Sequence, residues 1–266
     1  MDIATYLKHI NDKGPLKADK ATLDRLMANH LAAITFENID QQLGTPVSLD
    51  VKETYEKIVV NKRGGWCFEV NNLFGWALRE IGFEVKFLAG YVDEDHPEKG
   101  DASTHMFLRV NCDEPLMVDV GFGGGQLSAI PIKQTSSSQA PYTITMSHQD
   151  NNRWQYLETS HGTTSSFNFS LQAVEIDFFN DVHQYLQTNS ASSFVRTLTA
   201  QRRLKNKHIV LRGRVMSTFT KNEKHKLLIN SATELQERLN RDFNLDIPQI
   251  ADIWPKILNR HQQLFG

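Results

Sequence analysis

Apolar residues recur at helical spacing through the first third of the chain. From residue 23 to 34, and again from 51 to 59, they return every three or four positions, which predicts two helices that each bury one face. The most regular stretch follows Cys67, and Gly82 is well placed to end it because glycine readily adopts the backbone of a helix C-terminus. Its apolar positions are Val70, Leu73, Phe74, Ala77, Leu78 and Ile81.

Beyond Gly82 the pattern changes to short runs that are typical of strands. Clusters of Gly, Asp, Asn, Ser and Pro separate these runs, which favours an antiparallel sheet or a small barrel. A helical pattern returns from 177 to about 200, and the tail shows strands at 208–212 and 215–219 before a helix from about 231 to 243. Helices, then strands, then a mixed region predict an α+β chain of three parts. The strand runs are 83–92, 104–111, 116–122, 142–146 and 154–157.

Composition and charge narrow the possible partners. Of the 266 residues, 40% are apolar and 23% charged, as in an ordinary globular protein with a sizeable core. The 29 basic and 31 acidic residues give a net charge of −2, so no overall field favours nucleic acid or an anionic membrane. The sequence has neither a basic start followed by an apolar run nor a stretch of about 18 apolar residues. We therefore expect a cytoplasmic protein with no nucleic-acid or membrane partner.

Two cysteines are too few for a disulfide framework or a four-thiolate zinc site, so we expect reduced thiols and no metal. Cys67 follows a glycine pair and stands in the first turn of the best predicted helix. A helix N-terminus carries partial positive charge and unpaired N–H groups, which favour a reactive thiolate. A small buried apolar residue is the alternative, because free cysteines are usually buried. Cys112 has no basic neighbour, and we expect it to be inert.

A catalytic thiol needs a base, and the base needs a group that orients it. His105 opens an apolar strand, although nine other histidines compete for the role and a lone strand histidine is more often structural. Asp119 lies inside a second apolar run, where an unpaired carboxylate would cost several kcal/mol to bury. If the two strands form a hairpin, His105 and Asp119 lie close together across it. The chain order would then be Cys, His, Asp.

With these residues the chain resembles the arylamine N-acetyltransferase family. The family pattern of arginine, two glycines, any residue, cysteine, any residue, glutamate, any residue and asparagine is matched around Cys67, and further matches extend over nearly the whole chain. The residues that match the pattern are Arg63, Gly64, Gly65, Cys67, Glu69 and Asn71. The further matches are Phe36-Glu37-Asn38, Thr104-His105, residues 118–123, Asp177-Phe178 with Asn180, Ser192-Ser193-Phe194, and Leu211-Arg212 with Arg214.

The resemblance implies a fold as well as a reaction. It implies a helical bundle, a β-barrel and an α/β lid around a Cys–His–Asp core similar to that of papain-like proteases. On this chain the parts would be 1–82, which carries the cysteine, 83–185, which carries the histidine and aspartate, and 186–266. By the resemblance, Cys67 is the nucleophile, His105 the base and Asp119 the residue that orients it. Acetyl-CoA is the implied donor, and arylamines, arylhydrazines or N-hydroxyarylamines are the implied acceptors in a ping-pong reaction.

Substrate contacts are also expected from the resemblance. The glycine-rich run 121–125 lacks the Lys-Ser/Thr and the spacing of nucleotide-binding loops, and a glycine-rich strand end is the plain alternative. By resemblance this run borders the cleft and admits CoA. The expected acceptor contacts are Phe36, Phe122 and Phe194, and the expected CoA contacts are Thr104, Gly123 and Gly124. We expect a monomer or a weak homo-oligomer.

Two groups of charged residues, one around Cys67 and one in the C-terminal part, could have structural roles. Arg63 and Glu69 are expected to form an ion pair that supports the cysteine loop. Arg202 and Arg203, in the basic run 201–208, either attract the phosphates of CoA or form a solvated face, which is the commoner outcome.

Three other functions remain open at this stage. The chain could use another acyl-CoA donor or form an amide in secondary metabolism, as some relatives do. A papain-like protease shares the same type of triad, but the match over all three parts argues against it. A binding module without turnover would not need the complete set of Cys67, His105 and Asp119.

Overall fold

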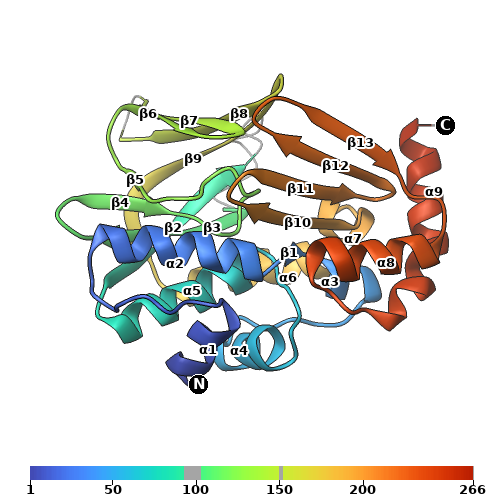
Figure 1. The fold of residues 1–266 in the computed structure, drawn as a ribbon, viewed down its shortest axis with the longest axis horizontal. Coiled ribbons are helices and arrows are strands. Elements are labelled where there is room, and N and C mark those ends of the chain that lie inside the picture. Colours follow the sequence, from blue (N-terminus) through green and yellow to red (C-terminus); the bar gives the residue numbers. More distant parts are fainter. Residues whose placement is uncertain (93–102, 150–151, 266) are drawn as a thin grey trace.

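The computed structural model describes residues 1–92, 103–149 and 152–265, and it contains two antiparallel sheets with helices packed against them (Figure 1). This arrangement confirms the predicted α+β class. Among the described helices, none is long and apolar enough to cross a membrane.

The N-terminal part is helical, as its apolar spacing predicts. The helices predicted at 23–34, 51–59 and after Cys67 are all present, and the second of them ends in a π-helical turn. Figure 1 shows these helices gathered on one side of the molecule. They are α1 (Ile3–His9), α2 (Lys20–Ala33), α3 (Ile39–Leu43), α4 (Val51–Tyr55), η1 (Glu56–Val60) and α5 (Cys67–Ile81).

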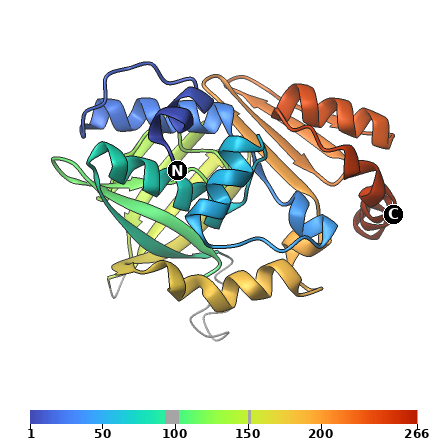
Figure 2. The ribbon, with the colours of Figure 1, turned by 90° about the horizontal axis from the view of Figure 1, so that it is seen from below.

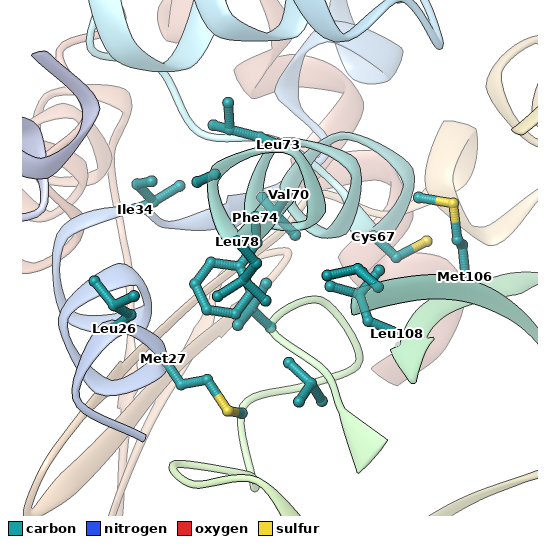
Figure 3. Close-up of a cluster of buried hydrophobic side chains, with 14 of the residues drawn as sticks. Leu26, Met27, Ile34, Cys67, Val70, Leu73, Phe74, Leu78, Met106 and Leu108 are labelled. Atoms are coloured by element: carbon teal, nitrogen blue, oxygen red, sulfur yellow. The ribbon is translucent and has the colours of Figure 1, made fainter. Parts of the chain in front are cut away.

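Helix α5 is the central element of this part. At its start the Glu69 carboxylate accepts the backbone N–H of Trp66 at 3.3 Å, and at its end Gly82 has the positive φ of +105° predicted for a helix stop. Figure 3 shows Phe74 and Leu78 on the side of α5 that faces α2, while Cys67 lies beside Met106 at the other end of the helix. The helix therefore packs along α2 and places its first residue against the neighbouring sheet.

An eight-stranded antiparallel sheet forms the middle of the chain, in the order β5-β4-β3-β2-β9-β8-β7-β6. Gln139 of β6 accepts the backbone N–H groups of Leu127 and Ser128, which lie just before β5, so a side chain connects the two edges of the sheet. The sheet is a nearly closed barrel. Its strands are β2 (Glu84–Val92), β3 (His105–Asn111), β4 (Pro115–Val118), β5 (Ile130–Pro131), β6 (Thr135–Gln139), β7 (Tyr142–His148), β8 (Trp154–Ser160) and β9 (Thr163–Val174).

Two predicted elements are wrong in extent. The strand expected at 116–122 ends at Val118, because the Asp119 carboxylate accepts the N–H of Gly121 and turns the chain out of the ladder. The helical stretch expected from 177 to 200 breaks into short helices and ends where β10 begins at Thr199.

A five-stranded antiparallel sheet and the last helices form the C-terminal part, which Figure 2 shows at the opposite end from the barrel. The short strand β1 joins this sheet from the N-terminal part by pairing with β10. The predicted strands at 208–212 and 215–219 and the helix at 231–243 are confirmed. The strands are β1 (Phe36–Glu37), β10 (Thr199–Leu204), β11 (Lys207–Arg212), β12 (Val215–Thr220) and β13 (Lys224–Leu228). The helices are η3 (Ile176–Phe179), α6 (Asn180–Thr188), α7 (Ser193–Arg196), α8 (Ala232–Phe243), η4 (Pro248–Ile253) and α9 (Trp254–Phe265).

Buried apolar side chains of the described residues form three clusters. One joins the N-terminal helices to β2, β3 and β4, a second fills the barrel, and a third lies between the five-stranded sheet and the C-terminal helices. The division at residues 82 and 185 stays a prediction.

Candidate active site

Cys67 is the first residue of α5, where the helix dipole favours a thiolate. The side chain is buried, with 2% exposure. The preceding glycines are required by close packing: a Cβ on Gly64 would lie 2.2 Å from the carbonyl oxygen of Thr35, and one on Gly65 would lie 2.9 Å from Glu69. Gly64 therefore lets the cysteine loop lie directly against Thr35, which precedes β1, and Gly65 leaves room for the Glu69 side chain of α5.

His105 and Asp119 come together as the hairpin prediction requires. Strands β3 and β4 pair with Leu108 opposite Val118, so the residues that begin β3 and follow β4 lie on the same end of the hairpin. His105 Nε2 is 2.6 Å from Asp119 Oδ2, and both side chains are buried. We refer to Cys67, His105 and Asp119 as the cysteine cluster.

Electrostatics in the cysteine cluster favour a charged imidazole. Burial alone would disfavour the imidazolium, but the charge of Asp119 and hydrogen bonds to Asp119 and Cys67 outweigh burial and raise the pKa of His105 to about 10. At neutral pH His105 is therefore protonated, and the positive charge lies between the carboxylate and the sulfur. An adjacent imidazolium is one of the settings that turn a cysteine into a nucleophile.

Asn71 connects the helix to both strands, a role that the sequence analysis missed. Its Nδ2 donates to Asp119 Oδ1 at 3.0 Å and to the carbonyl of Met106 at 2.7 Å, while its Oδ1 accepts the N–H of Val120 at 3.0 Å. Asn71 is fully buried and lies one turn after Cys67. That spacing within the family pattern was the available signal, because it places both side chains on one face of the helix.

A second set of buried charges lies behind the cysteine loop, and we refer to it as the ion-pair cluster. The predicted pair of Arg63 with Glu69 is wrong. Glu69 pairs with Lys57 at 2.8 Å, whereas Arg63 pairs with Asp40 at 2.8 Å and Glu37 at 3.2 Å; Lys57 also reaches Asp40 at 2.7 Å. Burial raises the pKa of Glu69 despite Lys57. The cluster contains three acids and two bases because β1 and α3 deliver two acids that local sequence did not connect to this loop.

A cavity of about 890 Å³ lies between the barrel and the five-stranded sheet. This volume suits a small-molecule site. Phe36, Phe122, Phe194 and Gly123 line it, so four of the six expected substrate contacts share one cavity. Thr104 and Gly124 are not among its lining residues, and neither is Cys67. Hydroxyl and amide side chains of β9 and β10 form much of the remaining wall.

Aromatic rings separate the cysteine cluster from this cavity. Phe122 contacts the His105 ring at a centroid distance of 5.2 Å, and Phe194 contacts Trp66, which precedes Cys67, also at 5.2 Å. The same loop approaches the nucleophile closely, since a Cβ on Gly121 would lie 2.8 Å from the Cα of Cys67. The cavity therefore ends at Phe122 and Phe194, whose rings contact His105 and Trp66 next to the thiol.

The other residues singled out in the sequence have contacts that indicate structural roles. Arg203 is buried and donates to the carbonyls of Gln139 and Ala140, and Arg202 donates to the carbonyls of Ala32 and Asp242. Neither arginine belongs to the solvated face that was the commoner expectation. Burial raises the pKa of the Cys112 thiol, which agrees with an inert cysteine. Within residues 1–92, 103–149 and 152–265, no three metal-ligating side chains of the His, Cys, Asp or Glu type gather.

Comparison with known proteins adds an independent line of support. A family model described as N-acetyltransferase matches residues 19–252. The chain is 32% identical to arylamine N-acetyltransferase of Mycolicibacterium smegmatis, with 94% of each chain covered, and 32% identical to arylamine N-acetyltransferase 1 of Mus musculus, with 74% and 76% covered. The solved structure of Mycobacterium marinum arylamine N-acetyltransferase in complex with CoA matches with a TM-score of 0.87 and 26% identity, covering 98% and 99% of the two chains. The chain belongs to the arylamine N-acetyltransferase family.

Proposed function

We propose that this protein transfers an acetyl group from acetyl-CoA to arylamines, arylhydrazines or N-hydroxyarylamines through an acetyl-Cys67 intermediate. The observation that carries the proposal is the position of His105, hydrogen-bonded to Asp119 and to the Cys67 sulfur at the start of a helix. The family relationship and the aromatic cavity beside this group support the same reaction. The combination is a papain-like Cys–His–Asp core within a three-part chain.

In the first half-reaction the Cys67 sulfur attacks the carbonyl carbon of the acetyl thioester. The bond from that carbon to the CoA sulfur breaks, and the imidazolium of His105 gives its proton to the leaving sulfur. One acyl–sulfur bond replaces another, so the step is close to balanced. Backbone N–H groups at the start of α5 are the donors that we assign to the transient oxyanion, because the first residues of a helix lack intrahelical acceptors.

In the second half-reaction the acceptor nitrogen attacks acetyl-Cys67. His105, now neutral, takes the proton that the nitrogen loses, and Cys67 leaves as a thiolate. The imidazolium–thiolate pair of the resting enzyme is thereby restored. Because the acetyl group rests on the protein between the two steps, ping-pong kinetics follow.

The cavity suits both substrates. Phe36, Phe122 and Phe194 offer faces and edges to an aromatic acceptor. The hydroxyl and amide side chains of its wall match the amides of the CoA arm, and Arg212 on the same wall supplies positive charge for phosphate. Contacts of CoA with Thr104, Gly123 and Gly124 remain part of the proposal.

Acetyl-CoA without acceptor tests the intermediate directly. We expect the intact protein to gain the mass of one acetyl group, located on Cys67 by peptide mapping, and to lose it when an arylamine is added. Cys67→Ala should not be labelled and should lose turnover by at least about 10³-fold. Cys112→Ser is the matched control and should be labelled like the wild type. An unlabelled wild-type protein, or label on Cys112, would contradict the proposal.

A further inference from the structure

Glu158 in β8 is a carboxyl of the cavity wall that the reaction above does not use. It is 4% exposed, and the hydroxyl of Tyr156 donates to its Oε2 at 2.9 Å. Its other oxygen, Oε1, lies 3.3 Å from the point where a Cβ on Gly123 would stand. Because position 123 is a glycine, this oxygen faces open space beside the loop that follows Asp119.

Gln201 in β10 approaches the same point from the other sheet. Its Oε1 lies 3.7 Å from the position of that missing Cβ, and Glu158, Gly123 and Gln201 all line the cavity. In the parts of the chain that the structure describes, we find no hydrogen bond to the Gln201 side chain. Two acceptor oxygens from two different sheets thus converge on one point at the cavity wall, a geometry that suits a ligand group with N–H or O–H donors.

Charges around Glu158 favour a neutral donor over a cation. Burial and the charge of Asp119 raise the pKa of Glu158 to about 7, although Tyr156, Arg203 and Gly125 act in the opposite direction. The Arg203 guanidinium already supplies positive charge beside this carboxyl, so a second cation would be repelled. At pH 8, above this pKa, Glu158 is largely ionised and accepts hydrogen bonds, and the amino group of an aromatic amine or a phenolic hydroxyl is neutral and meets no such repulsion.

We propose that Glu158 and Gln201 form a donor subsite that selects acceptors carrying an amino or hydroxyl group on the ring, opposite the nitrogen that is acetylated. The inference rests on the proposed acetyl transfer. Gly121 packs against Cys67, and Gly123 follows two residues later, so the subsite loop lies at most about 7 Å further along the chain. An aromatic ring with substituents at opposite positions has the size to connect the two places.

The test compares two acceptors within each variant. The ratio of kcat/KM for 4-aminophenol to that for 4-methylaniline reports the subsite, because a general loss of activity cancels in the ratio. Glu158→Gln keeps the shape, but the Tyr156 hydroxyl holds the amide oxygen in the Oε2 position and turns the amide NH₂ toward the subsite. We expect this ratio to fall about tenfold in Glu158→Gln and several-fold in Gln201→Leu.

Glu237→Gln, an exposed glutamate on α8, is the matched control and should leave the ratio at the wild-type value. A ratio that stays within about twofold of wild type in both Glu158→Gln and Gln201→Leu overturns the subsite, provided that wild type acetylates both amines. Absence of an acetyl adduct in the wild type overturns the proposed function itself. The mass measurement therefore separates the two failures.

Discussion

The cysteine cluster and the ion-pair cluster are two sets of buried charges on either side of the same loop, and they differ in how their charges are balanced. In the ion-pair cluster every charge has at least one partner of opposite sign, with N–O distances of 2.7 to 3.2 Å. In the cysteine cluster one imidazole stands between one carboxylate and one sulfur. A proton can therefore move within the cysteine cluster without breaking a network of ion pairs.

The difference shows why burial of charge does not by itself identify a catalytic site. Lys57 and Arg63 have their pKa values raised because burial is outweighed by surrounding carboxylates, so both stay charged and hold their position. None of the five ion-pair residues lines the 890 Å³ cavity. The cysteine cluster lies behind two rings that do line it, Phe122 and Phe194. A position next to the cavity and a proton that can move distinguish the cysteine cluster, a candidate catalytic site, from the ion-pair cluster, which is structural.

Asp119→Asn should give the largest loss of activity, and the loss should come from the catalytic step and not from unfolding. The amide cannot stabilise the imidazolium and favours the wrong tautomer of His105, so we expect kcat/KM to fall about 10³- to 10⁴-fold. Loss of the carboxylate charge should also lower the pKa of His105 from about 10, so the imidazolium that supports the Cys67 thiolate loses its proton at lower pH. Steady-state rates and iodoacetamide kinetics would measure both, and a near-normal rate would break the distinction between the two clusters.

Lys57→Met should have the opposite signature, a loss of stability. Removal of the ammonium leaves Glu69 and Asp40 without a shared cation in a buried place, which costs about 3–5 kcal/mol in the free energy of unfolding. Urea denaturation would measure this cost. The matched control is Lys133→Met, whose partner Glu114 is exposed, and it should change stability by less than about 1 kcal/mol. Acetylation per folded molecule should stay within a few-fold of wild type. A loss of activity comparable to that of Asp119→Asn would show that the ion-pair cluster is also needed for catalysis.

Local patterns sufficed to predict the elements that carry the cysteine cluster. The apolar spacing after Cys67 and the stop at Gly82 predicted α5, and two apolar runs predicted the β3–β4 hairpin. These features depend on neighbours in the sequence. The prediction that His105 lies close to Asp119 is confirmed because a short hairpin leaves little freedom in the register.

Features that depend on distant pairing were missed. Strand β9 carries the polar run Thr163–Ser166, and β6 is rich in serine, so neither has the alternation that marks a strand. Strand β1 has only two residues and exists because β10 pairs with it across the chain. Glu37 of β1 and Asp40 of α3 both form ion pairs with Arg63, and Glu69 pairs with Lys57 instead. The wrong ion pair in the prediction therefore follows from a tertiary contact that no local spacing reveals.

Asn71→Ala should lower activity less than Asp119→Asn and stability less than Lys57→Met. It sharpens the comparison because Asn71 belongs to neither charge cluster yet holds one of them in place. Its loss leaves the Met106 carbonyl and the Val120 N–H without their partner, and it removes one of the donors to Asp119. We expect about 1–3 kcal/mol of lost stability and up to about 10²-fold lower kcat with little change in KM.

The adjacent residue supplies the control for this positioning role. Asn72 is also buried, but its side chain donates to the carbonyl of Leu49 and not to Asp119. Asn72→Ala should therefore lower the free energy of unfolding by a similar amount while kcat and the pH profile stay at wild-type values. If both alanine variants lower kcat alike, the effect of Asn71 is general destabilisation. If only Asn71→Ala lowers kcat, the orientation of Asp119 depends on a side chain that carries no charge.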